Sequence, residues 1–253
     1  MGCRSVGHRG GYSGSIVRVA KDPRLYQRPV NVAQVATVPR LASWDKAGSP
    51  GLLELAEWLA EVDRVTIEMH VEAIARPLAV ELSVGLAPGV EVTAGGRDLD
   101  NYLLPVAQRL GPEQITAAFA TKRPGGSSYL AISTAVSDTI PPPTGRAVLL
   151  SGSASGTAWK QTLHEDLRSG GLALIRPGPV WLTVAISTGP GRVWTNLWKP
   201  LIDSLGPLLG EDPEQPFHPY DDRVVNLGLH HQRDPALGHD VVVHLWWGPA
   251  PPA

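Results

Sequence analysis

Cysteine is almost absent from this chain, whose single one is Cys3. One thiol cannot close a disulfide within the chain, so a disulfide scaffold is excluded and a reducing compartment fits. The sequence also lacks a run of the roughly 18–20 apolar residues that span a membrane, and Met1–Gly11 lacks the apolar middle of a secretory signal. We therefore expect a cytoplasmic protein with no membrane partner.

A surplus of positive charge is missing as well. The formal net charge is −2, and a broad phosphate-binding coat needs an excess of Lys and Arg on one face. Non-specific coating of nucleic acid is thus disfavoured, while a local basic groove stays open. Because 43% of the residues are hydrophobic, the chain has enough apolar surface for a folded core.

Hydrophobic periodicity predicts an α+β fold. Spacings of three and four predict amphipathic helices, and alternation predicts half-buried strands. In the first half we expect a short strand at Val30–Val38, a helix at Gly51–Ala75, a strand at Leu78–Leu86, a helix at Asp100–Leu110 and strands at Ile115–Lys122 and Tyr129–Val136. In the second half we expect a helix at Thr157–Ser169, a strand at Val180–Ser187, a helix at Thr195–Leu205 and strands at Arg223–His230 and Asp240–Trp247.

A proline run divides the chain. The segment Asp138–Arg146 reads Asp-Thr-Ile-Pro-Pro-Pro-Thr-Gly-Arg, a composition typical of a stiff spacer. We predict an N-terminal arm at 1–39, a first unit at 40–137, this linker at 138–146 and a second unit at 147–253.

The two units show a weak internal repeat. Asn101 matches Asn196, Pro105 matches Pro200, and Leu110-Gly111 matches Leu205-Gly206, always 95 residues apart. The same order of helices and strands surrounds both segments, which favours duplication over chance. Chance matching within a shared α+β composition is the alternative.

The first unit carries a pair of carboxylates. Asp98 and Asp100 precede a predicted helix, so both can face one point beside its N-terminus while Asn101 caps it. Such oxygen ligands suit Mg²⁺. The plainer interpretation is an ordinary helix cap next to an acid that the helix dipole favours.

The second unit lacks this pair and has other polar residues. Lys199 lies one turn into its predicted helix and Asp203 lies four residues later, so both occupy one face. Asp221-Asp222 precede the next strand, where a further carboxylate could reach a metal. A surface ion pair and a plain turn are the alternatives.

Together these residues resemble a known signature. The run Arg97-Asp98-Leu99-Asp100-Asn101 resembles the Asp-x-Asp-Asn motif of RusA-type Holliday junction resolvases, the crossover junction endodeoxyribonucleases. The rest of that signature is similar to Asn196-x-x-Lys199-x-x-x-Asp203, followed by Asp221-Asp222-x-Val224-Val225. The resemblance covers most of 51–247, with its parts divided between two units.

The resemblance implies tandem RusA-like units, each with a helix on a small mixed or antiparallel sheet, forming an intramolecular pseudo-dimer or a homo-oligomer. It also implies Mg²⁺-dependent cleavage of branched DNA. Carried over position by position, the catalytic residues are Asp98, Asp100, Lys199 and Asp222, and the metal ligands are Asp98, Asp100, Asp221 and Asp222. Because each unit has only part of the set, either the units pool their residues into one composite site, or catalysis is lost and the fold serves as a DNA- or protein-binding module.

Other polar and aromatic residues complete the expectations. Residues near the motifs that could bind nucleic acid are Arg97, Asn101, Arg192, Asn196 and Arg223. Four tryptophans, Trp194, Trp198, Trp246 and Trp247, could stack on unpaired bases or fill a core. His230 and His231 should point to opposite faces of one strand, which disfavours a shared zinc ion.

Overall fold

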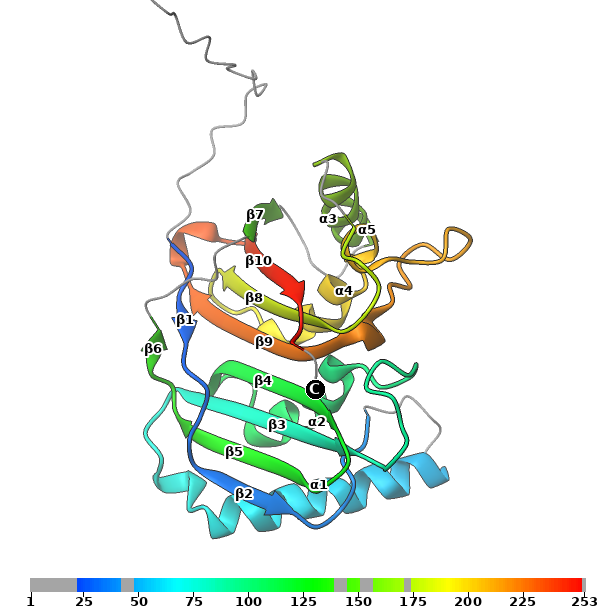
Figure 1. The fold of residues 1–253 in the computed structure, drawn as a ribbon. Helices are drawn as coiled ribbons and strands as arrows, with labels where there is room; N and C mark the ends of the chain where they lie inside the picture. Colours follow the sequence, from blue (N-terminus) through cyan, green and yellow to red (C-terminus); the bar gives the residue numbers. More distant parts are fainter. Residues whose placement is uncertain (1–21, 42–47, 139–144, 151–156, 171–173, 252–253) are drawn as a thin grey trace, which may run out of the picture.

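The computed structural model describes residues 22–41, 48–138, 145–150, 157–170 and 174–251. These residues form a mixed α+β fold built on one eight-stranded sheet in the order β2-β5-β3-β4-β9-β8-β10-β7 (Figure 1). The predicted α+β class is therefore confirmed. None of the helices in the described part of the chain meets the length and hydropathy needed to span a lipid bilayer.

Helices and strands are interspersed along the chain. The first half contains β1 (Leu25–Tyr26), β2 (Val32–Val35), α1 (Pro50–Glu68), η1 (Val71–Ala73), β3 (Leu78–Leu86), α2 (Leu99–Leu110), β4 (Ile115–Pro124), β5 (Ser128–Thr134) and β6 (Ser137–Asp138). The second half contains β7 (Gly145–Leu150), α3 (Thr157–Ser169), β8 (Val180–Thr188), η2 (Trp194–Leu197), α4 (Trp198–Ile202), α5 (Gly206–Leu209), η3 (Asp221–Arg223), β9 (Val224–Arg233), η4 (Pro235–Leu237) and β10 (Val241–Pro249).

The main sheet has the same pairing pattern from either edge. Strand β2 is antiparallel to β5, β5 is antiparallel to β3, and β3 is parallel to β4. From the other edge, β7 is antiparallel to β10, β10 is antiparallel to β8, and β8 is parallel to β9. Both parallel pairs have a register shift after their first residue pair, at Leu78 and at Val180.

The halves meet in the middle of the sheet, where β4 pairs antiparallel with β9. Each strand has ten residues, and their fifth residues, Phe119 and Gly228, are register partners. The third residue of each strand pairs with the seventh of the other, as Ala117 with His230 and Thr121 with Asn226. The register is thus symmetric about the Phe119–Gly228 pair.

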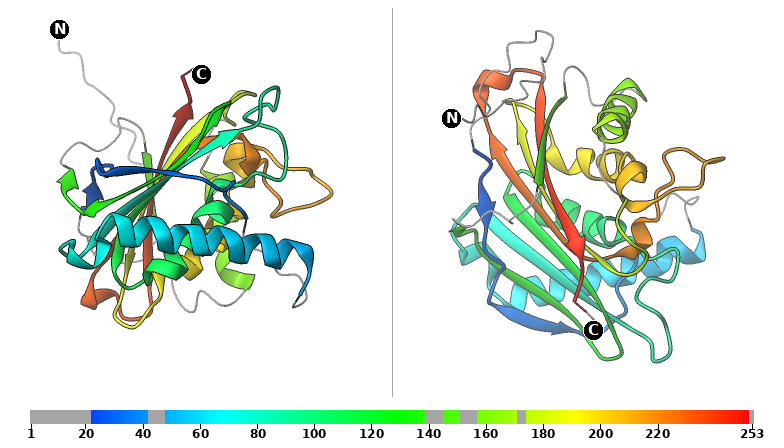
Figure 2. Two further views of the ribbon diagram at one scale, coloured as in Figure 1. Left: turned by 90° about the horizontal axis from the view of Figure 1, so that it is seen from below. Right: turned by 45° about the horizontal axis from the view of Figure 1, so that its top comes forward.

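Helices α1 to α5 lie on one face of this sheet (Figure 2). Alternate residues of each strand point to that face and join the main core. In β3 these are Leu78, Val80, Leu82, Val84 and Leu86, which belong to the same hydrophobic cluster as residues of α1, α2 and α4. The segment around β1 crosses the opposite face, where Tyr26 packs with Ala79 and Phe119.

Two predicted helices differ from the structure. The helix expected at Gly51–Ala75 ends at Glu68 and is followed by one 3₁₀ turn. In place of one helix at Thr195–Leu205, the structure has the 3₁₀ turn η2 followed by the short helix α4, which ends at Ile202. The next helix, α5, begins beyond the expected range at Gly206, and Pro207 in its first turn lacks the backbone N–H that would continue the hydrogen bonding of α4.

The predicted boundaries also need correction. The arm at 1–39 contributes β2, an edge strand of the main sheet, so this part belongs with the first unit. Most of the linker at 138–146 lies outside the described residues. Its ends do not form a separate spacer, because Asp138 pairs with Leu25 and β7 begins at Gly145.

Candidate functional site

The predicted carboxylate pair lies at the start of α2. Asp98 is the N-cap residue, yet its side chain forms no capping hydrogen bond. Asn101 Nδ2 instead donates to Asp98 Oδ2 at 3.0 Å. Asp100 follows in the first turn and is only 3% exposed. An ordinary helix cap does not require a second carboxylate that is buried in the first turn.

The polar residues of the second half form an ion network. Lys199 Nζ lies 3.0 Å from Asp203 Oδ1 and 3.3 Å from Asp221 Oδ2. The predicted Lys199–Asp203 pair on one helix face is therefore confirmed. Lys160, from α3, adds a 2.7 Å contact to Asp203 Oδ2. The network joins three separate segments of the second half.

Electrostatics connect this network to the first half. The pKa of Asp100 is raised to about 7, mainly by burial, with smaller contributions from Asp221, Asp98 and Asp203 and with Lys199 opposing the shift. Burial and the Asp98 carboxylate likewise raise the pKa of Asp221 to about 6. The carboxylates of the two halves are therefore close enough to interfere with each other's ionisation.

Lys199 is the cation at the centre of these carboxylates. Burial alone would lower its pKa, but the charges of Asp100, Asp221 and Asp203 raise it above the ordinary lysine value. Asp100 belongs to the first half and the other two to the second. Lys199 therefore stays protonated across the physiological range.

A second lysine joins the halves through hydrogen bonds. Lys122, near the end of β4, donates from Nζ to the main-chain carbonyls of Arg97 at 3.0 Å and Asp222 at 2.6 Å. Burial lowers its pKa to about 8, against the effect of Asp98, Asp222 and Asp221. Lys122 thus holds the loop before α2 beside the segment that leads into β9.

The donor set suits a hard divalent cation. Asp98, Asp100, Asp221 and Asp222 offer only carboxylate oxygens, which are the ligands that Mg²⁺ prefers. Gly95 also belongs to the site, since a Cβ there would lie 3.5 Å from Asp222 Oδ2. Within the part of the chain that the structure describes, no three His, Cys, Asp or Glu side chains are already grouped to hold a metal ion.

The proposed nucleic-acid residues are found in different places. Arg97 lies at the site, with Nη1 3.4 Å from the carbonyls of Ala94 and Gly95. Asn101 holds the Asp98 carboxylate. Arg192 donates to the carbonyl of His239, away from this cluster. Asn196 is exposed.

The Arg223 side chain connects distant segments of the second half. Its guanidinium donates to the main-chain carbonyls of Ile175, Arg176, Gly178 and Leu209. A guanidinium has five N–H donors, and these contacts direct it into the fold. These contacts favour a structural role for Arg223, and our sequence-based interpretation of it as a nucleic-acid ligand stays a prediction.

The tryptophans are not a stacking surface for bases. Trp194, Trp198 and Trp246 are at most 7% exposed, and Trp247 packs against the main core. Of the two alternatives, the core is correct. His230 and His231 do point to opposite faces, because His230 packs on Tyr26 and Phe119 whereas His231 stacks on Trp194.

Sequence reasoning missed Lys160 and gave little weight to Lys122. Lys160 reaches the site from α3, which resembles an ordinary amphipathic helix in the sequence. Lys122 stands at the end of an apolar strand, in register with the side chains that face the core. A buried lysine at that position is a signal that could have been noticed.

Comparisons with known proteins add no relative. The chain matches no protein-family model, and no curated protein sequence matches it.

Proposed function

We propose that this chain is a duplicated RusA-like protein whose halves form one composite site for the Mg²⁺-dependent hydrolysis of phosphodiester bonds in branched DNA. The observation that carries the proposal is that the two parts of the motif, one in each half of the chain, lie close enough to interact. Asp98 and Asp100 from one half share an electrostatic cluster with Lys199, Asp203 and Asp221 from the other.

The sheet supports the duplication. Its strand order and strand directions repeat from both edges, and the central register is symmetric about Phe119 and Gly228. Two copies of a β2-α1-β3-α2-β4-β5 unit, joined through their third strands, β4 and β9, would produce this arrangement. In such a pseudo-dimer each unit brings its helix N-terminus toward the other unit's central strand.

The residues divide the chemical work. Asp98, Asp100 and Asp221 or Asp222 would hold Mg²⁺, which would polarise the phosphate and favour ionisation of a bound water. In the reaction, a water oxygen bonds to phosphorus and the P–O bond to one sugar oxygen breaks, which leaves a phosphate monoester and a hydroxyl. Lys199 balances the growing phosphate charge, while Asp203 and Lys160 position Lys199.

Local positive charge supports contact with DNA despite the net charge of −2. Arg97 lies in the loop before α2, while Lys160 and Lys199 reach the site from α3 and α4. A short basic track of this kind positions a strand without coating the protein.

The test is cleavage of a synthetic four-way DNA junction in Mg²⁺. We expect cleavage by the wild-type protein and at least a hundredfold loss in Asp100→Asn, since an amide is a poorer Mg²⁺ ligand. Glu57→Gln, an exposed acid on α1, is the matched control and should keep full activity. Absence of cleavage, or equal activity in Asp100→Asn, would reject the enzymatic proposal.

A second candidate function is non-catalytic binding. It is favoured by the ion network itself, because Lys199 already bridges Asp203 and Asp221 as a structural ion pair would. A binding protein would retain junction affinity without cutting. Affinity that falls steeply with salt would indicate DNA as the partner, and no affinity at low salt would indicate a protein partner.

A further inference from the structure

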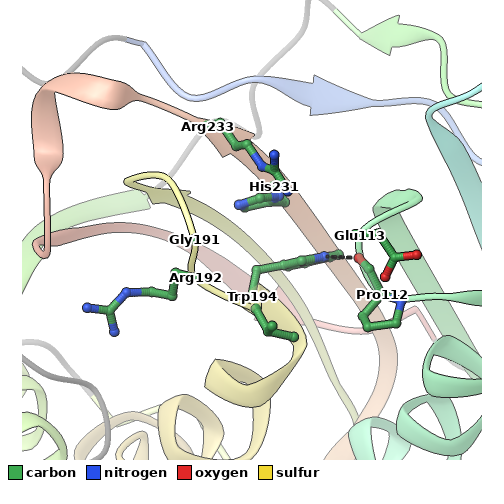
Figure 3. A pocket seen from close by; sticks show the side chains of 8 residues that line it. Pro112, Glu113, Gly191, Arg192, Trp194, His231 and Arg233 are labelled. Atoms are coloured by element: carbon green, nitrogen blue, oxygen red, sulfur yellow. Dashed lines mark hydrogen bonds between the residues drawn. The ribbon is translucent and has the colours of Figure 1, made fainter.

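A pocket of about 220 Å³ lies where the loop before η2 meets the ends of the two central strands. Its walls include Glu113, Arg192, Trp194, His231 and Arg233 (Figure 3). The indole of Trp194 stacks on the His231 ring, with 5.0 Å between centroids and 7° between planes. Trp194 Nε1 donates to the carbonyls of Pro112 and Ile115 at 3.2 and 3.1 Å.

This pocket occupies the symmetric counterpart of the composite site. His231 is the eighth residue of β9, as Lys122 is the eighth of β4. Glu113 lies two residues before β4, as Asp222 lies two before β9. The loops correspond as well, because Val193 is the N-cap residue of η2 and Asp98 is that of α2.

The counterpart residues cannot perform the same chemistry. Val193 stands in place of Asp98, and Thr195 stands in place of Asp100 as the second residue of its helix. The lysine is also missing, since Leu104 is the sixth residue after its N-cap, as Lys199 is after Val193. Glu113 is the one carboxylate that lines the pocket in the described residues.

The wall of the pocket is formed by buried, closely packed side chains. Trp194 is 2% exposed and its indole spans from His231 to the start of β4. Burial, with a contribution from Arg233, lowers the pKa of His231 to about 4, so its imidazole is neutral at pH 7. A neutral ring under an indole offers neither the anionic ligands nor the cation of the composite site.

From this asymmetry we infer that the protein makes one nick per bound junction, in a single strand, instead of two symmetric nicks. The inference rests on the proposed function. A four-way junction has two-fold symmetry and would present two equivalent phosphates to the two positions of a pseudo-dimer. Only the position with Asp98, Asp100 and Lys199 can hydrolyse its phosphodiester bond, and that step consumes one water molecule. The product is a nicked junction that remains joined.

A supercoiled plasmid that extrudes a cruciform separates the two outcomes. One nick releases the supercoiling and the cruciform is reabsorbed, so linear plasmid forms only when two opposite strands are cut within one binding event. We expect open circles without linear product, lost in Asp100→Asn and unchanged in Glu113→Gln. Linear product would overturn the inference and leave the proposed function standing. If neither open circles nor linear plasmid form, the proposed function is overturned, and the inference falls with it.

A binding measurement tests the same inference without cleavage. Calorimetric titration with Mn²⁺ should give the same stoichiometry for wild-type protein and for Glu113→Gln. A lower stoichiometry in Glu113→Gln would show that the pocket holds a metal ion and would overturn the inference.

Discussion

Lys122 Nζ donates a 2.6 Å hydrogen bond to the main-chain carbonyl of Asp222, 100 residues further along the chain. The same ammonium donates to the carbonyl of Arg97. One buried side chain in the central strand of the first half therefore fixes the entrance to the central strand of the second half. The relative placement of the two half-sites depends on this contact.

Substitution of Lys122 should impair cleavage because it releases both segments. We expect Lys122→Met to cut a four-way junction at least about tenfold more slowly, since a 1 Å misplacement of catalytic groups can cost about a hundredfold. Single-turnover kinetics measures this. Arg123→Met is the control, because Arg123 bonds within its own hairpin to Ser127. Equal rates in both variants, with both folded by circular dichroism, would contradict the prediction.

Two neighbouring tryptophans should differ in their tolerance of phenylalanine. Trp194 Nε1 has two carbonyl partners, whereas Trp198 Nε1 has none in the structure. Both variants lose buried area, but only Trp194→Phe leaves carbonyls without a donor, which costs about 1 kcal/mol or more. Urea unfolding should rank Trp194→Phe below Trp198→Phe in stability. The reverse ranking would refute this assignment.

Arg223 should matter for stability and not for DNA affinity. Arg223→Met removes the donor for four carbonyls, so we expect the free energy of unfolding to fall by about 2 kcal/mol. The salt dependence of junction binding should stay as in the wild type, because no phosphate contact is lost. In Arg97→Met the opposite pattern is expected. A shallower salt slope in Arg223→Met would show that its guanidinium binds phosphate.

Acid should destabilise the fold through its buried histidines. His231 has a pKa of about 4 in the fold because of burial and Arg233, against about 6.5 in an unfolded chain. Between these values the unfolded state binds more protons, so stability present above pH 6.5 is lost progressively as the pH falls toward 4.

The variant His231→Gln isolates this effect. Gln can keep a hydrogen bond to Thr188, which lies 2.9 Å from His231 Nε2, and it does not titrate. The variant should be less stable at pH 7, and its deficit should shrink by about 2 kcal/mol at pH 5. Urea titrations at both pH values measure the change. A constant deficit would mean that His231 does not carry the pH dependence.

Long alternating or periodic segments were readily predicted, and short or interrupted ones were not. Strand Leu78–Leu86 and helix Thr157–Ser169 have the expected bounds, because each presents one continuous apolar face. The strands Leu25–Tyr26 and Gly145–Leu150 depend on distant partners for their hydrogen bonds. Their local sequences do not indicate which strands they pair with.

The candidate site was predictable only in part. Local motifs identified Asp98, Asp100 and Lys199, because helix starts and spacing are local properties. The proximity of the half-sites arises from the sheet pairing, and the contribution of Lys160 arises from the packing of α3 against α4. A linear pattern contains neither. The main-chain contacts of Arg223 could not be predicted either, because charge alone does not distinguish a phosphate ligand from a donor to main-chain carbonyls.

The central claim is that carboxylates from the two halves share one metal site, and calorimetric titration with Mn²⁺ tests it most directly. We predict that Asp98→Asn and Asp221→Asn each abolish the same binding event, while Glu57→Gln leaves it intact. Binding that survives in either aspartate variant with unchanged affinity and stoichiometry would contradict a composite site.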